Sequence, residues 1–431
     1  MTETSTDKDE FALSIDSLTY GPYGVGRRKG RAIFVPMTAP GDEARVRTVE
    51  ERKNYALGEV AQLIKPSPLR QTPPCPYFGS CGGCPWQHVA YSTQLASKGK
   101  NVEDALRRIG KLEGFELLPI IRSPREYHYR RRLRLQIDGQ RRVGFYRAFS
   151  HELIEIDSCL IADPSVDHHL THAKTWAGEL KTRLREIEII RGDQREEIVL
   201  VGQAERDFCA EDEIVSASFL TQHPEISGLI LFGRGWRRSW GQARISIRSE
   251  NGITMQVDAE TFTQVNHEAN ELLVSQLLGW GKFHDQDRIL ELYSGAGNFT
   301  LPVAQRSREV FAVEGNPRSV QNGEINTRLS RLGNIRWVCS HAPKAARQLT
   351  KNGEKFSKII LNPPRSGAKG LEENLSALGA EKILYVSCDP TTLARDLALL
   401  KTKGYTLKRV QPIDLFPHTF HVETLAEVVR A

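Results

Sequence analysis

The feature that most constrains the fold is a regular alternation of short apolar runs and helix-like stretches in the C-terminal part of the chain. Five runs succeed one another before a final pair, at Arg288–Leu292, Val310–Val313, Ile335–Cys339, Lys358–Leu361 and Lys382–Val386, then Thr406–Ile413 and Thr424–Val429. This rhythm predicts a parallel sheet with helices on both faces. Because ligands of such sheets bind outside the carboxyl ends of the strands, the residues that follow each run are the first to examine for chemistry.

The preceding part of the chain has a different pattern. Residues 11–64 alternate short apolar runs with Gly and Pro turn signals, which predicts a small β-barrel. The five prolines of Pro66–Pro76 indicate a linker, and a helix-like stretch follows at Tyr91–Arg108. The region from Glu126 to Ile253 mixes strands with helices. There we expect strands at Arg132–Ile137 and Glu197–Val201 and a helix near His172–Glu186.

Composition excludes several classes of protein. A length of 431 residues, 39% hydrophobic and 26% charged, is typical of a globular protein of a few domains. No run approaches the roughly 18 apolar residues of a membrane-spanning helix. The polar start MTETSTDKDE predicts a disordered tail at residues 1–10 and no secretory signal. Seven Cys are too few for a disulfide framework in so long a chain, which favours a reducing, cytoplasmic location.

A glycine-containing loop, ELYSGAGNFT, follows the first apolar run. Gly295 and Gly297 let the backbone turn sharply and approach a ligand closely. The next run ends in Glu314, 314 − 295 = 19 residues after Gly295, near the interval of about 20 residues for an acid that binds ribose hydroxyls. The loop lacks both the third Gly of a dinucleotide site and the Lys of a P-loop. We therefore expect a nucleoside without a pyrophosphate, and S-adenosylmethionine in particular.

Three further strand ends carry reactive residue types. Asn362 follows the run at Lys358–Leu361, Cys388 follows Lys382–Ser387, and Glu423 precedes the last run. A Cys at a strand tip can act as a nucleophile, and a nearby carboxylate can act as a general base. Taken singly, the three would be an inert thiol, a solvated loop end and a turn cap. Together at one sheet edge they form a candidate catalytic group.

Three Cys lie close together in CPYFGSCGGCPWQ. Cys75, Cys81 and Cys84 have the spacing C-x5-C-x2-C, and Cys159 is the leading candidate for a fourth ligand. Structural zinc prefers two closely spaced Cys pairs, so this pattern favours an iron–sulfur cluster, with zinc as the alternative. Cys209 and Cys339 lack sequence partners and are expected in the core.

Positive charge is concentrated in one stretch, residues 125–147. It contains eight Arg against one Glu and one Asp, a net of 8 − 2 = +6, which equals the excess of the whole chain, 59 − 53 = +6. Four aromatic residues, Tyr127, Tyr129, Phe145 and Tyr146, lie among the arginines. Guanidinium groups mixed with aromatic faces suit unpaired RNA bases. The alternative is a solvated strand pair, and strand alternation in YRRR places at least one Arg toward the protein interior.

Several motifs together resemble the RNA (uracil-5-)-methyltransferases that carry a TRAM domain and a [4Fe-4S] cluster, and most closely those that act on 23S rRNA. They are FVPMTAPGD, CGGC followed by WQHVAYSTQ, YRRRLRLQ, GFYRAFSHELIEIDSCLI, TFTQVN, SGAGNFTLP, VSCDPTTLARD and FPHTFHVE. The resemblance implies a TRAM or OB-like β-barrel at 11–67 and a central α+β RNA-binding subdomain with the iron–sulfur cluster at 68–255. It implies a Rossmann-like class I methyltransferase domain at 256–431.

The resemblance also implies residue roles. Cys388 would add to uracil carbon 6, and Glu423 would remove the carbon 5 proton after methylation. Phe262 would hold the flipped target base. The matching positions are, for S-adenosylmethionine, Gln264, Tyr293, Gly295, Asn298, Glu314, His341 and Asn362; for the cluster, Cys75, Cys81, Cys84 and Cys159; and for the target base, Phe262. The arginine-rich stretch adds Arg130, Arg132, Arg141 and Arg142 as candidates for contact with RNA.

Three positions depart from the family pattern. Asn362 replaces an Asp and cannot balance the positive sulfonium, His341 replaces an acid or amide, and Glu291 replaces an Asp. Two other enzyme readings remain, a tRNA T-loop uridine 5-methyltransferase and, from the NPP motif, an amino-methyltransferase. A third is an inactive cofactor- and RNA-binding ribosome assembly factor. We expect a cytoplasmic monomer that acts on RNA, most plausibly 23S rRNA, and no membrane association.

Overall fold

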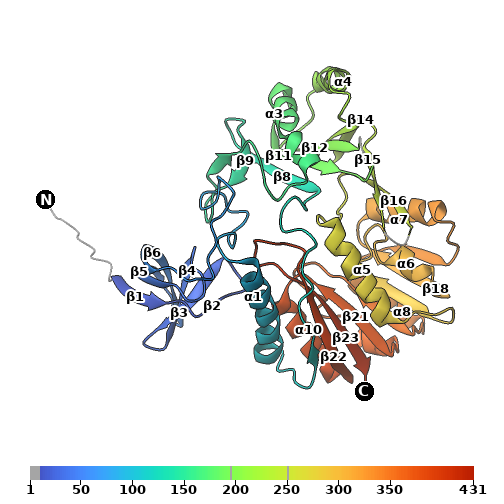
Figure 1. Ribbon diagram of the computed structural model, residues 1–431. Coiled ribbons are helices and arrows are strands. Elements are labelled where there is room, and N and C mark those ends of the chain that lie inside the picture. Colours follow the sequence, from blue (N-terminus) through green and yellow to red (C-terminus); the bar gives the residue numbers. More distant parts are fainter. Residues whose placement is uncertain (1–9, 195–196, 250–251) are drawn as a thin grey trace.

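The computed structural model describes residues 10–194, 197–249 and 252–431. The tail expected at residues 1–10 lies outside these residues except for Glu10, which begins a strand. Figure 1 shows a small β-domain on one side, a central α/β-domain above, and a large α/β-domain below. Among the described residues, no helix is both long enough and apolar enough to cross a bilayer.

The N-terminal domain is a strongly bent six-stranded sheet with the order β1-β5-β6-β4-β3-β2. Its strands are β1 Glu10–Ser14, β2 Ser17–Leu18, β3 Tyr23–Arg28, β4 Arg31–Pro36, β5 Glu43–Glu51 and β6 Tyr55–Lys65. In β4 and β5, buried and exposed residues alternate, so Ile33, Val35, Ala44 and Val46 form the core of this half-barrel. The predicted sequence of short strands and turns corresponds to this domain.

The central domain contains a seven-stranded sheet of order β10-β9-β8-β11-β12-β13-β14, accompanied by a two-stranded ribbon. The strands are β8 Arg132–Ile137, β9 Val143–Tyr146, β10 Leu153–Glu155, β11 Leu184–Arg191, β12 Ile198–Ala204, β13 Gly228–Gly233, β14 Trp236–Gly241, β15 Arg244–Arg248 and β16 Thr254–Asp258. The helices are α2 Pro164–His168, α3 Leu170–Glu179 and α4 Asp212–Gln222. The helix expected to reach Glu186 ends at Glu179, because Leu184 begins a strand paired on both sides by β8 and β12.

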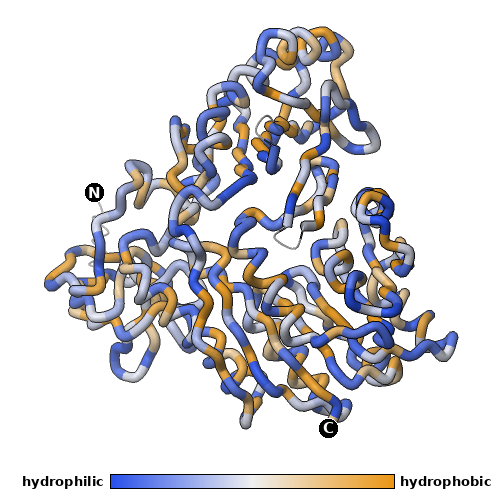
Figure 2. Tube along the Cα trace, turned by 45° about the vertical axis from the view of Figure 1, so that its right-hand side comes forward, coloured by the Kyte–Doolittle hydropathy of each residue, from blue (hydrophilic) through white to orange (hydrophobic). Residues whose placement is uncertain are grey.

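The C-terminal domain is an eight-stranded sheet of order β19-β18-β17-β20-β21-β23-β22-β7, parallel except for β23. The strands are β7 Glu116–Leu117, β17 Arg288–Leu292, β18 Glu309–Glu314, β19 Ile335–Cys339, β20 Lys358–Leu361, β21 Lys382–Ser387, β22 Tyr405–Ile413 and β23 Glu423–Arg430. Its helices are α5 His267–Gly281, α6 Thr300–Ala304, α7 Pro317–Leu329, α8 Ala342–Lys351, α9 Glu372–Ala377 and α10 Pro390–Thr402. Figure 2 shows the apolar strands running through the middle of this domain, as predicted for a doubly covered parallel sheet.

Residues 91–121 differ from their predicted place. They were expected in the central subdomain, but α1 (Tyr91–Asp104) and the π-helical turn Ala105–Ile109 lie against α10 (Figure 1). Val102 and Leu106 are fully buried in the core of the C-terminal domain, and β7 pairs with β22 at the edge of its sheet. Residues 91–121 therefore belong structurally to the C-terminal domain, although they precede the central domain in sequence.

Candidate active site and cysteine cluster

The topology brings Cys388 and Glu423 to the same edge of the sheet. Cys388 follows parallel strand β21, whereas Glu423 begins antiparallel strand β23, so both lie where the parallel strands end. Ser387 pairs with Thr424, and the next residues along this register are Cys388 and Glu423. Opposed residues of an antiparallel pair point to the same face. The two predicted catalytic side chains therefore lie on the same face of the sheet, at the ends of two adjacent strands.

Burial controls the protonation of this pair. Glu423 is 3% exposed, and burial raises the pKa of its carboxyl to about 8. Burial, followed by the nearby Glu423 charge, raises the pKa of the Cys388 thiol to about 11, while Arg365 acts in the opposite direction. At neutral pH, both groups hold their protons in the free protein. Such shifts are typical of residues that exchange protons in a cleft.

The position of Cys388 is fixed by the helix that follows it. The Asp389 carboxylate caps α10 by accepting from the backbone N–H groups of Thr391 and Thr392 at 2.8 and 3.0 Å, and Pro390 occupies the first turn. This cap places Cys388 immediately before a helix N-terminus, whose dipole favours a thiolate.

Two residues from distant parts of the chain complete the surroundings. The Tyr20 hydroxyl, from the N-terminal domain, donates to the backbone carbonyl of Cys388 at 2.8 Å. Arg365, after β20, donates to the Nε2 atom of His421 at 3.2 Å. Burial, with the Arg365 charge next, lowers the pKa of His421 to about 4, so that its ring is neutral and can accept this bond. Neither Tyr20 nor Arg365 was predicted as a site residue. Tyr20 lies outside the motifs, and in the NPPR motif only Asn362 was assigned a role.

The loop between β22 and β23, residues 414–422, leads directly into Glu423. Lys98 of α1 forms a fully buried ion pair with Asp414 at 2.6 Å and also donates to the Phe416 carbonyl. The other contacts come from Trp86 and Gln94 to His418, from Tyr129 to Pro417, and from Asn266 to Leu415. His418 has φ = 67°, a left-handed conformation that these contacts hold in place. The Tyr20 ring of the N-terminal domain also lies edge-on to Phe420, so all three domains border the segment that leads to the candidate base.

The glycine loop forms the centre of the predicted cofactor crevice. Gly295 and Gly297 have φ of 57° and 110°, and nothing lies within 4 Å of a Cβ placed on Gly295. The Glu314 carboxylate accepts from the Gly295 N–H at 3.0 Å and ties the loop to the end of β18. Tyr293 also has positive φ, 67°. A non-glycine residue in this region stores strain, which clusters at binding sites.

The other predicted cofactor residues lie along the same edge. Asn362 follows β20, which pairs with β17, and His341 adjoins Gly315, which follows Glu314 at the end of β18. Gln264 precedes α5, and exposed Phe262, at 71%, lies in the same segment. Asn298 exchanges two amide hydrogen bonds, of 2.9 and 3.0 Å, with Asn270 of α5, a residue that no sequence motif indicated.

Two buried polar atoms lie beside this crevice without a hydrogen-bond partner among the described residues, Glu291 Oε1 and Ser294 Oγ. The other Glu291 oxygen accepts from the Thr300 hydroxyl at 2.7 Å, and burial raises the pKa of this carboxyl to about 8. Unsatisfied polar atoms beside an open glycine cradle suit a polar ligand. The residues present therefore fit a nucleoside cofactor.

The four predicted cluster cysteines come together across 84 residues of chain, 159 − 75. Cys75, Cys81, Cys84 and Cys159 line one cavity of about 90 Å³, whose walls include Leu133, Phe145, Ile156 and Ile161. Burial raises the pKa of Cys159 to about 11, and the thiols of Cys81 and Cys84 are raised in the same way. Four converging thiols in an apolar pocket are a donor set suited to a soft metal centre. Cys339, expected in the core, is instead exposed, and Cys209 is half-buried.

The arginine-rich stretch is only partly available to a ligand. Arg132 is 8% exposed and its guanidinium donates to the backbone carbonyls of Ala259 and Thr261, which corrects its assignment to an RNA surface. It is the inward-facing Arg that strand alternation required. Arg141 donates to the Leu180 carbonyl at 2.6 Å.

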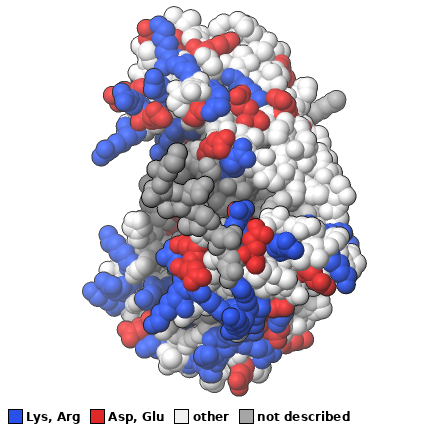
Figure 3. Space-filling view, turned by 90° about the vertical axis from the view of Figure 1, so that its left-hand side faces the viewer, with Lys and Arg blue, Asp and Glu red and all other residues white. Residues whose placement is uncertain are grey.

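Three other arginines of the stretch are more exposed to solvent than Arg132. Arg142 pairs with Asp138 at 2.7 Å, and both it and Arg141 are exposed. Arg130 lines the cysteine cavity. Figure 3 shows one face of the molecule on which Lys and Arg gather at both ends, interspersed with Asp and Glu.

Antiparallel β23 lies between β21 and β22, and the glycine loop follows β17. Together these two features define an S-adenosylmethionine-dependent methyltransferase. A family model described as tRNA (Uracil-5-)-methyltransferase matches residues 90–429, and one described as the TRAM domain of tRNA (uracil(54)-C(5))-methyltransferase matches residues 13–69. The chain belongs to the RNA (uracil-5-)-methyltransferase family and has a TRAM domain at its N-terminal end.

Full-length relatives support this placement. The chain is 32% identical to the 23S rRNA (uracil(1939)-C(5))-methyltransferase RlmD of Pectobacterium atrosepticum, over 99% of this chain and 95% of the relative. It is 35% identical to an uncharacterised RNA methyltransferase of Thermosynechococcus vestitus, over 96% of each. The crystal structure of the Pyrococcus abyssi tRNA (uracil-54, C5)-methyltransferase with S-adenosyl-L-homocysteine superimposes with a TM-score of 0.75 at 25% identity, covering 97% of this chain and all of that one.

Proposed function

We propose that this RNA methyltransferase modifies carbon 5 of a uridine in 23S rRNA through a covalent Cys388 adduct. The proposal rests on the meeting of Cys388 and Glu423 at the cofactor edge of the sheet. Similarity over the whole chain to relatives named as 23S rRNA enzymes favours rRNA as the substrate. The enzyme is proposed to work in the cytoplasm as a monomer.

Each chemical step has a residue to perform it. The Cys388 thiolate bonds to uracil carbon 6, and the electrons of the carbon 5–carbon 6 double bond move to carbon 5 and its neighbouring carbonyl. Bound S-adenosylmethionine supplies the methyl group that carbon 5 takes. The Glu423 carboxylate then removes the carbon 5 proton, the double bond re-forms, and the Cys388 thiolate leaves.

The cofactor is proposed to be held by the residues that line the crevice. They are Gln264, Tyr293, Gly295, Asn298, Glu314, His341 and Asn362. Glu314 already orients the glycine loop through the Gly295 N–H. Asn362 offers a carbonyl oxygen but no negative charge toward a sulfonium, so we expect Asn362→Asp to tighten cofactor binding.

The cysteine cavity is proposed to hold a [4Fe-4S] cluster on Cys75, Cys81, Cys84 and Cys159. Its apolar walls and four thiols support the assignment. The cluster would tie both ends of the arginine-rich stretch, which lies between Cys84 and Cys159, to one point. Absorbance near 400 nm that is lost with iron chelation is expected, and a colourless protein with one zinc would contradict it.

RNA is proposed to contact Phe262, Arg130, Arg141 and Arg142. Phe262 is 71% exposed and would stack on the flipped base. Charge reversal at Arg141 and Arg142 should weaken RNA binding and reduce its salt dependence, without altering cofactor affinity. Fluorescence anisotropy with an rRNA fragment over a salt series measures this effect, and unchanged RNA affinity would contradict it.

One assay tests the covalent mechanism. The protein is mixed with labelled S-adenosylmethionine and an rRNA fragment that carries 5-fluorouridine, whose carbon 5 fluorine cannot leave as a proton does. A denaturant-resistant protein–RNA adduct is expected with the wild type and with Cys339→Ala, an exposed cysteine control. Cys388→Ala should form none. Methyl transfer without an adduct would favour amino-group methylation, and no signal at all would favour an inactive binding protein.

The second candidate substrate is the tRNA T-loop. The structural similarity to the Pyrococcus abyssi tRNA (uracil-54, C5)-methyltransferase favours it. Methyl incorporation into unmodified 23S rRNA fragments and into tRNA transcripts, compared at equal concentration, separates the two. A higher kcat/KM on tRNA would overturn the rRNA proposal and leave the chemistry intact.

A further inference from the structure

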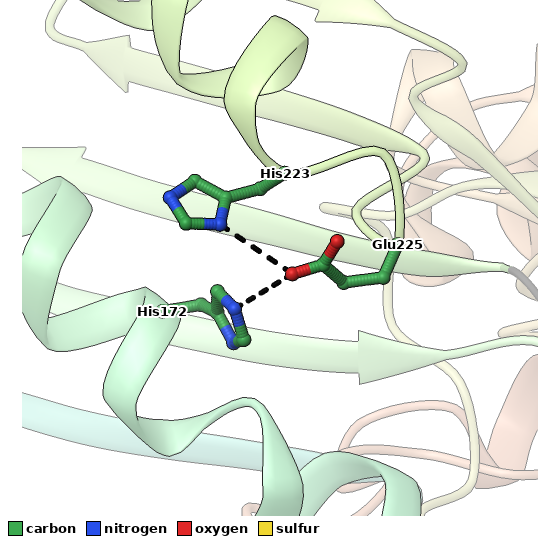
Figure 4. A group of neighbouring side chains, drawn as sticks. All are labelled: His172, His223 and Glu225. Atoms are coloured by element: carbon green, nitrogen blue, oxygen red, sulfur yellow. Dashed lines mark ion pairs between the residues drawn. The ribbon is translucent and has the colours of Figure 1, made fainter.

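Three side chains that the methyl transfer does not use meet on the outer side of the central domain. His172 lies in the first turn of α3, His223 ends α4, and Glu225 lies in the turn before β13. Each offers one ligand atom, and these atoms all lie within 4.8 Å of one another. Figure 4 shows the two imidazole rings and the carboxylate pointing toward one another from elements about 50 residues apart in sequence (223 − 172 = 51).

The carboxylate is the centre of the group. Glu225 Oε1 lies 2.7 Å from His172 Nε2 and 3.4 Å from His223 Nδ1. The two histidines are half-buried, whereas the Glu225 side chain is 41% exposed, so the group is open to solvent on one side. The other nitrogen of His172, Nδ1, is buried without a hydrogen-bond partner among the described residues.

The backbone and core fix the positions of these side chains. Residues 223–226 form a turn closed by the Ile226 N–H donating to the His223 carbonyl at 3.0 Å, and Pro224 fixes the backbone at the second position of that turn. The His223 ring lies 4.4 Å, centroid to centroid, from Phe219, which packs in turn near buried Trp176. Two ligands on one short turn and a third on a neighbouring helix form a pre-arranged site that needs little ordering to bind an ion.

We propose that His172, His223 and Glu225 bind a divalent transition-metal ion, Zn²⁺ in the cell, with water at the remaining position. Two imidazole nitrogens and one carboxylate oxygen form a ligand set that zinc accepts, and three protein ligands leave a fourth position open. The ion would join α3 to the α4–β13 turn, where both helices cover the central sheet, and would stabilise this domain. The proposal is independent of the proposed methyl transfer and of the cysteine cluster.

The alternative is an ion-free arrangement in which Glu225 accepts hydrogen bonds from the two imidazole rings. Glu225→Gln separates the two. The Gln carbonyl keeps a hydrogen-bond acceptor for both rings, whereas it is a poor zinc ligand. The metal proposal therefore requires loss of zinc binding in Glu225→Gln with the ion-free thermal stability unchanged.

Zinc binding to the full chain tests the site. Competition with a chromophoric chelator measures affinity, and X-ray absorption at the zinc edge distinguishes nitrogen and oxygen ligands from the sulfur ligands of the cysteine cavity. The wild type should bind one zinc with only nitrogen and oxygen ligands and gain thermal stability on adding it. His172→Ala, His223→Ala and Glu225→Gln should each weaken this binding at least about tenfold.

His168→Ala is the matched control. His168 is exposed and its ring is 6.3 Å from that of His172, yet it lies outside the ligand group, so its removal should leave zinc affinity unchanged. Zinc that is retained with equal affinity in the three ligand variants, or that is coordinated by sulfur alone, would overturn the proposal. Because Glu225 is exposed, its variant keeps the test informative even where a histidine variant unfolds.

Discussion

At the scale of single residues, burial favours the neutral forms of the proposed reactive pair, Cys388 and Glu423. Burial raises the pKa of the Glu423 carboxyl to about 8, while burial and the Glu423 charge raise the pKa of the Cys388 thiol to about 11. Keeping Glu423 neutral removes a negative charge that would oppose formation of the Cys388 thiolate. The guanidinium of Arg365 lowers the pKa of Cys388 and so favours the thiolate. With a pKa of about 8 against about 11, Glu423 loses its proton before Cys388 as the pH rises, and the Arg365 charge lowers the cost of forming the thiolate beside it.

Turnover should depend on the ionisation of Glu423. Because the base must have lost its proton, kcat is expected to rise as the pH increases through about 8. Glu423→Gln should form the RNA adduct but release methylated product much more slowly, so that adduct accumulates. Single-turnover kinetics from pH 6 to 9 measures both steps, and a pH-independent release step would contradict the assignment.

The same group should affect stability. Its raised pKa means that the folded protein holds a proton that the unfolded chain has lost, between the ordinary Glu pKa near 4.3 and about 8. This contribution is fully present below that window and is lost as the pH rises through about 8. Thermal unfolding of Glu423→Gln should therefore show a smaller loss of stability over this range than the wild type, and identical pH profiles would contradict this expectation.

At the scale of elements, α1 and the β22–β23 loop are joined by the ion pair between Lys98 and Asp414. Both side chains are fully buried, and Asp414 also accepts from the Tyr91 hydroxyl at 3.0 Å. Removing one member of a buried pair leaves the other charge without compensation, which typically costs about 3–5 kcal/mol. The loop leads into Glu423, so this loss of stability affects the element that positions the proposed base.

We expect Lys98→Met to lower the melting temperature strongly and to reduce kcat more than the KM for the cofactor. Replacing Asp414 with Asn in the same chain should recover part of the stability, because the uncompensated carboxylate is removed. Lys100→Met is the control, since its pair with Asp104 is exposed and worth at most about 1 kcal/mol. Equal effects of Lys98→Met and Lys100→Met would show that the buried pair does not support the loop.

The bounds of most strands in the methyltransferase sheet were predicted closely from sequence, because each is a short apolar run bounded by turn residues. Arg132–Ile137 was also predicted with the bounds of β8. The association of α1 with the C-terminal domain could not be foreseen, since its face is polar in sequence and its buried Lys98 looks like a solvent-exposed residue. Its partner Asp414 is 316 positions away. Long-range pairing of this kind leaves no periodic signal.

At the scale of the whole molecule, the TRAM domain reaches the candidate active site. The Tyr20 hydroxyl bonds to the Cys388 carbonyl, and the Tyr20 ring lies edge-on to Phe420 with centroids 5.7 Å apart. The residues that meet here come from positions 368 apart. Of the candidate site, the reactive and cofactor-side positions were therefore visible as motifs, whereas this supporting contact was visible only in the folded chain.

Tyr20→Phe should reduce kcat by roughly two- to tenfold, the equivalent of one lost hydrogen bond, with the KM for the cofactor unchanged. The matched control is Tyr23→Phe, in the same domain, whose ring stacks on Phe149. Steady-state kinetics on an rRNA fragment compares the two. A uniform loss of RNA affinity with unchanged kcat would assign Tyr20 to substrate binding instead.

The order of strands in the sheet has a consequence for synthesis on the ribosome. Strand β23 lies between β21 and β22 although it is made after both, so β22 cannot join the sheet until β23 has emerged. The ion pair between Lys98 and Asp414 cannot form until a further 316 residues have been translated, which takes roughly 15–60 s at usual elongation rates. During that time, the Lys98 ammonium lacks its partner, and Val102 and Leu106 lack their final cover. Nascent chains of this enzyme should therefore engage chaperones through residues 91–113 and become catalytically competent only in the last stage of translation.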